Sequence, residues 1–170
     1  MDFFGLEIPD AGPVFLAALV VHVLAGLSAV VAGALAATAR KRRGRHPRAG
    51  LVYLWCLGFV AASALVMAII RWEHSAYLLL LAALLVGLGT MGWMSQPNRF
   101  PRRVRLHAIG MGGSYIVLLT GFYVDNGAQL PLWDQLPPIL YWVLPAIVGV
   151  PLIWLALRRY RAGQSSRATL

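Results

Sequence analysis

The sequence predicts an all-α integral membrane protein, a bundle of five transmembrane helices. Of its 170 residues, 59% are hydrophobic and 12% are charged, and the mean hydropathy is +0.70. Soluble domains carry about 25% charged residues, so this composition excludes a soluble globular fold. Cys56 is the single cysteine, which excludes a disulfide framework.

Five predominantly apolar segments give the expected helices in chain order. Each is close to or longer than the ~20 residues that a helix needs to cross the hydrocarbon core. Inside a bilayer the backbone must satisfy its own hydrogen bonds, and a segment of this length does so only as a helix. The expected spans cover residues 13–39, 51–70, 76–94, 106–124 and 138–157. Together they form a single transmembrane domain over residues 1–170.

The distribution of charge orients these helices. Residues 40–48, 99–105 and 158–167 carry six, four and four of the fifteen Lys and Arg residues. Arg71 is the remaining one, and it lies on the other side of the five-span arrangement with all six carboxylates. The positive-inside rule therefore places the N-terminus outside and the C-terminus in the cytoplasm. We expect a multi-pass protein of the cell inner (plasma) membrane. A net charge of +9 would suggest nucleic acid in a soluble protein. Here the bases lie in loops on one side of the membrane, so we expect contact with anionic lipids at the arginine loops and no nucleic-acid partner.

Histidines are the residues that could carry chemistry. Apart from span edges, no Asp, Glu, Lys or Arg lies inside a span, which disfavours an ion-coupled transporter. His22 is well inside the first span, His46 lies in the loop before the second, and His107 lies at the start of the fourth. Neutral imidazole ligates haem iron and transition metals. His22, His46 and His107 are therefore the candidate cofactor-binding and metal-binding residues.

Depth limits which histidines can meet. His46 and His74, the latter in an expected outer loop, are about 42 Å apart along the second span at 1.5 Å per residue, so they cannot share a site. His46 and His107 are both expected at the inner interface and could approach each other. His22 shares a helix face with Gly26, and that glycine can leave room for a flat porphyrin. The same small face would equally allow close helix packing, with His22 bonded to a neighbouring carbonyl.

The glycines within residues 87–92 match the pattern G-x-G-x-x-G. In a dinucleotide-binding site this pattern joins a strand to a helix. Here it lies inside an expected membrane helix, so we predict that these glycines serve close helix packing.

Four short motifs point to one family. They are His22 with Gly26, residues 46–53, His107 with Met111, Ser114 and Tyr115, and residues 130–153. Together they resemble a bacterial family of predicted membrane proteins catalogued as a domain of unknown function. The resemblance implies that His22, His46 and His107 are the family-type positions, and it supplies no substrate.

A much looser similarity is to the cytochrome b561 type of haem bundle, in which paired histidines near each face hold two haems. This chain departs from that pattern because His46 is expected in a loop and the outer histidines differ in depth. We therefore expect one haem or one metal ion in place of two haems.

Three functions remain open. The first is a protein with a histidine-ligated haem b or transition-metal ion that acts in electron transfer or quinone-linked redox chemistry. The second is a non-enzymatic membrane scaffold that contacts anionic lipid and binds a membrane-protein partner or a second copy of itself. The third is a carrier for a small neutral molecule along glycine-rich spans.

Overall fold

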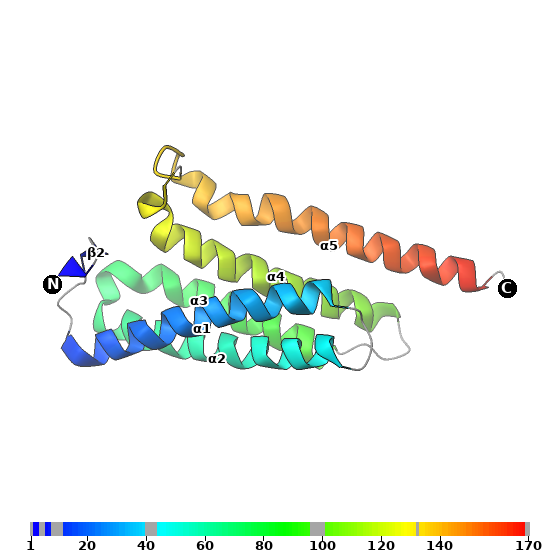
Figure 1. Cartoon of the computed structure of the whole chain (residues 1–170), viewed down its shortest axis with the longest axis horizontal. Helices are drawn as coiled ribbons and strands as arrows, with labels where there is room; N and C mark the ends of the chain where they lie inside the picture. The colour runs from blue at the N-terminus through cyan, green and yellow to red at the C-terminus, as the bar shows by residue number, and fades with distance from the viewer. Residues whose placement is uncertain are drawn as a thin grey trace. The chain divides into compact units, whose positions relative to one another are not determined.

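The computed structural model describes residues 2–3, 6–7, 12–39, 44–95, 101–131 and 133–168. Within these ranges the chain forms five long helices (Figure 1). They are α1 (Gly12–Thr38), α2 (Arg45–Ile70), α3 (Trp72–Met94), α4 (Pro101–Asn126) and α5 (Ile139–Ala168). Each contains a stretch long and apolar enough to cross a membrane. The predicted fold class is confirmed, and the protein is an all-α, multi-pass membrane protein.

Three short elements accompany these helices. The strands β1 (Asp2–Phe3) and β2 (Leu6–Glu7) pair antiparallel near the N-terminus. The 3₁₀ helix η1 (Gly127–Gln129) directly follows α4. The hydropathy pattern predicted none of them, because elements of two or three residues are too short to leave a periodic signal.

The helices extend beyond the apolar segments that predicted them. α2 begins at Arg45 and α4 at Pro101, each several residues before the expected span, and Arg71 alone separates α2 from α3. Arginine is a good helix former, and proline is well tolerated in a first turn, so a helix continues past the hydrocarbon boundary. The loop placements of His46 and His74 were therefore wrong. His46 lies in the first turn of α2, and His74 lies in the first turn of α3.

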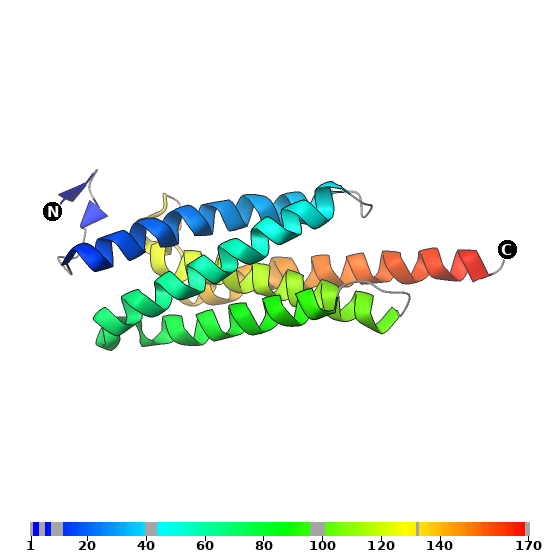
Figure 2. The same cartoon turned by 90° about the horizontal axis from the view of Figure 1, so that it is seen from below.

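The chain divides into two compact units, Met1–Ala82 and Ala83–Leu170. In the first unit α1 and α2 lie side by side (Figures 1 and 2). The buried residues of α1 are mostly alanines, namely Ala29, Ala32 and Ala36 together with Phe15. Small side chains allow two helix backbones to approach closely in a membrane. Ala29 and Ala36 lie on the same face of α1 as His22 and Gly26, and their burial supports the packing role that the sequence offered for this face.

In the second unit α4 and α5 interlock through two glycines and two isoleucines. A Cβ built at Gly112 of α4 would lie 2.7 Å from side-chain atoms of Ile153 of α5. In the reverse sense, a Cβ at Gly149 of α5 would collide with the side chain of Ile116. Each isoleucine thus occupies the space above a glycine of the opposite helix, and the residue order requires the two helices to run antiparallel.

The contact between the second half of α3 and α4 brings backbone against backbone. A Cβ at Gly110 would lie 2.5 Å from the Gly92 nitrogen and 2.7 Å from the Leu88 carbonyl oxygen. These are backbone atoms, which cannot rotate away as a side chain does. The prediction that glycines of the 87–92 segment serve helix packing is confirmed at Gly92, whereas a Cβ at Gly87 would meet no atom within 4 Å.

Substituting Gly110 with alanine is expected to destabilise the second unit. The new methyl group would force α3 and α4 apart, and overpacking of this kind costs about 1–3 kcal/mol. Gly87→Ala is the matched control, because it adds the same methyl group in open space and raises helix propensity. Thermal unfolding of both variants in detergent would measure the difference. Equal midpoints for Gly110→Ala and wild type would contradict the backbone contact.

Candidate histidine site

His22 lies on α1 and faces α2. Its Nδ1 is 3.2 Å from the Val60 carbonyl oxygen and 3.1 Å from the Ser63 Oγ. The Ser63 hydroxyl donates its proton within its own helix, to the carbonyl oxygens of Phe59 at 2.7 Å and Val60 at 3.0 Å. Because a carbonyl can only accept, the hydrogen bond to Val60 requires the proton on His22 Nδ1, which donates it. Neutral His22 is therefore the Nδ1–H tautomer, with its lone pair on Nε2.

His46 lies where α1 ends and α2 begins. Its Nδ1 lies 2.8 Å from the Ala36 carbonyl oxygen. Because α1 ends at Thr38, this carbonyl is among the last four of the helix, which have no partner from within it. The imidazole donates Nδ1–H to this oxygen and so caps the C-terminus of α1.

His107 makes the same contact in the second unit. Its Nδ1 lies 2.8 Å from the Gly92 carbonyl oxygen. α3 ends at Met94, so this carbonyl is also two residues before the end of its helix. The close approach of Gly110 to Gly92 brings the first turns of α4 within reach of this carbonyl. Two helices thus end in the same way, each capped by a histidine from the helix that follows it.

The structure separates His22 from His46. His46 bonds to Ala36, and the helical rise from His22 to Ala36 is about 21 Å. These two histidines therefore cannot ligate the same iron or metal ion. His107 belongs to the other compact unit, and the expected approach of His46 to His107 stays a prediction. The side chain of His74 lies outside the described residues. Among the side chains that are described, no three His, Cys, Asp or Glu residues gather where they could hold a metal ion.

His22 differs from the other two histidines in its position along the partner helix. The Val60 carbonyl lies inside α2, where the helix supplies its own donor, so no helix end requires the His22 hydrogen bond. One turn further along α1, a Cβ built at Gly26 would meet no atom within 4 Å. A methyl group would therefore fit at Gly26 without a clash, and the expected space for a flat group beside His22 stays a prediction. An imidazole held in one tautomer fits the chemistry of a haem ligand.

Comparison of the chain with protein-family models, with curated proteins and with solved structures finds no match.

Ser63 is the one partner of the site that the sequence analysis did not single out. It is the only serine in α2, it is 5% exposed, and it supplies the oxygen closest to His22 Nδ1. A hydroxyl within an apolar span is a usable signal, because such a group must find a hydrogen-bond partner.

Substituting either capping histidine should lower the free energy of unfolding of its unit. His46→Ala leaves the Ala36 carbonyl without its cap, and His107→Ala does the same for Gly92, with an expected loss of about 1 kcal/mol each. Thermal unfolding in detergent measures the loss. Gln can still donate an N–H, so His46→Gln should recover part of the stability lost in His46→Ala. Midpoints of the alanine variants equal to that of wild type would contradict a capping role.

Proposed function

We propose that the protein is a multi-pass protein of the inner membrane in which His22 ligates a b-type haem for electron transfer or quinone-linked redox chemistry. The observation that supports this most directly is the hydrogen bond from His22 Nδ1–H to Val60 and Ser63. Imidazoles that ligate metals donate their other ring N–H in this way, which fixes the tautomer and the ring orientation. The placement of the arginine loops supports the inner membrane.

Each residue of this site has a defined part. The Val60 carbonyl and the Ser63 hydroxyl hold the ring and increase the basicity of Nε2. The planar group would lie beside the imidazole at Gly26, where an added Cβ would meet no atom within 4 Å. The apolar side chains of α1 and α2 keep water away, and burial is one of the factors that set a redox potential. When bound, haem would supply one-electron chemistry, and one or two protein nitrogens are sufficient to hold it.

His46 and His107 are secondary candidates for the ligand. Both have the same Nδ1–H tautomer as His22, so their Nε2 atoms have the same ligating chemistry. Each also caps a helix end, and that role alone accounts for its position. A transition-metal ion near these residues is the corresponding secondary cofactor.

A visible spectrum of the detergent-purified protein, oxidised and then reduced with dithionite, tests the proposal. We expect a Soret band with reduced α and β bands in the wild type, lost in His22→Ala and retained in His46→Ala and His107→Ala. Ser63→Ala should keep the bands and shift the midpoint potential, because it removes a partner of the ligand and leaves the ligand in place. A Soret band that survives His22→Ala and disappears in His46→Ala or His107→Ala would show that the haem ligand is one of the histidines at the capped helix ends.

The second candidate is a non-enzymatic membrane scaffold. The observation that favours it is the glycine packing of α3, α4 and α5, since such contacts hold helices together within one chain or between chains. In that case the histidines serve only as hydrogen-bond donors. A flat visible spectrum, with no bound metal by elemental analysis, would favour the scaffold and exclude the haem proposal.

A further inference from the structure

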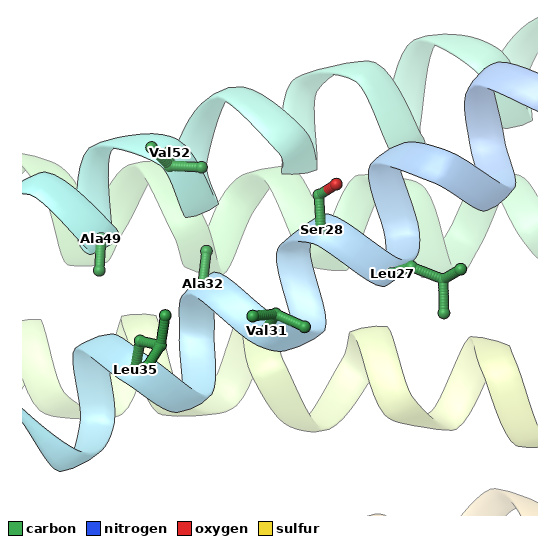
Figure 3. A pocket seen from close by; sticks show the side chains of 7 residues that line it. All are labelled: Leu27, Ser28, Val31, Ala32, Leu35, Ala49 and Val52. Atoms are coloured by element: carbon green, nitrogen blue, oxygen red, sulfur yellow. The ribbon is translucent and has the colours of Figure 1, made fainter.

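A groove of about 450 Å³ lies along the α1–α2 pair within the first unit (Figure 3). α1 contributes Leu27, Ser28, Val31, Ala32 and Leu35 to its lining, and α2 contributes Ala49 and Val52. Except for the Ser28 hydroxyl, every side chain of the lining is apolar. Leu27, Val31, Leu35 and Val52 are each more than half exposed. The groove follows α1 for about 12 Å of helical rise from Leu27 to Leu35.

Two arginines stand at one end of this groove. Arg45 and Arg48 are exposed residues in the first turn of α2. Arg45 precedes Ala49 by four residues and Arg48 precedes Val52 by four, so all four residues lie on one face of the helix. The apolar lining of the groove therefore continues directly into a pair of positive charges.

We propose that this groove is a binding site for one anionic phospholipid, with an acyl chain along α1 and the headgroup phosphate between Arg45 and Arg48. Because a charged side chain is costly in the hydrocarbon core, the two arginines must lie at the membrane interface. The groove runs from that interface toward the middle of the helix pair, as an acyl chain does. Guanidinium groups form charge-assisted hydrogen bonds with phosphate oxygens. A free phosphate ion would use the arginines and leave the apolar groove empty.

His46 positions the cationic end of this site. Its hydrogen bond to the Ala36 carbonyl joins the first turn of α2, which carries both arginines, to the end of α1. The distance between the arginines and the apolar lining is fixed in this way. The lipid site does not depend on haem, so the two proposals are tested separately.

Native mass spectrometry of the full chain in detergent tests the site with two probes of matched acyl chains, palmitoyl-oleoyl phosphatidylglycerol and palmitoyl-oleoyl phosphatidylcholine. We expect one phosphatidylglycerol retained per chain and much weaker retention of phosphatidylcholine. The double variant Arg45→Gln/Arg48→Gln should lower the affinity for phosphatidylglycerol roughly 30-fold, since each arginine near a membrane surface contributes about fivefold. The matched control is Arg102→Gln/Arg103→Gln, which removes two exposed arginines from α4 and should leave the affinity unchanged.

A second pair of variants tests the apolar half of the site. Ser28→Phe places a ring in the groove from an exposed position and should lower retention of phosphatidylglycerol at least fivefold. Val20→Phe is its control, because Val20 is 58% exposed on the same helix and is not part of the lining. Any one of three results would overturn the proposal: equal retention of both lipids, equal losses in the two arginine pairs, or no effect of Ser28→Phe. Absence of retained lipid, as expected if another part of the chain fills the groove, would overturn it as well.

Discussion

Backbone carbonyls at the C-terminal end of a helix have no partner within that helix and must find a hydrogen-bond donor outside it. This constraint acts on every helix of the chain. At two of these ends the chain uses one solution, a histidine Nδ1–H from the following helix that donates to a carbonyl two residues before the end. The bond satisfies the carbonyl and at the same time ties the following helix to the end of the helix before it. In each compact unit it therefore sets how one helix continues into the next.

Different packing brings each of the two histidines close to the carbonyl that it caps. At Gly92 the approach of α4 is made possible by Gly110, whose missing side chain lets the two backbones come together. At Ala36 the residue itself is small and 8% exposed, and His46 reaches its carbonyl from the first turn of α2. In both places the carbonyl belongs to a small residue, so no side chain of that residue stands in the way of the imidazole.

Much of this architecture could be predicted from the sequence. The number of helices and the ends of α1 and α3 follow from the apolar segments, and with the ends known the carbonyls that need caps could also be located. The starts of α2 and α4 could not be located in this way, because hydropathy marks where hydrocarbon begins and arginine-rich turns remain helical beyond it. That error placed His46 in a loop. Ser63 was missed because only the pairing of α1 with α2 brings it level with His22, and a single sequence does not contain that pairing.

His22 differs from His46 and His107 because it bonds a carbonyl inside a helix and not one at a helix end. Its acceptor carbonyl, that of Val60, lies within α2, so the bond caps no helix end. A buried polar ring costs free energy unless it is hydrogen-bonded, and an aliphatic residue at this position would pack without that cost. The arrangement around His22 instead fixes which nitrogen carries the proton and how the ring is oriented. Those are the two properties that a metal-ligating imidazole requires, and the same hydrogen bond to Val60 supplies the interhelical contact that the packing alternative predicted for His22.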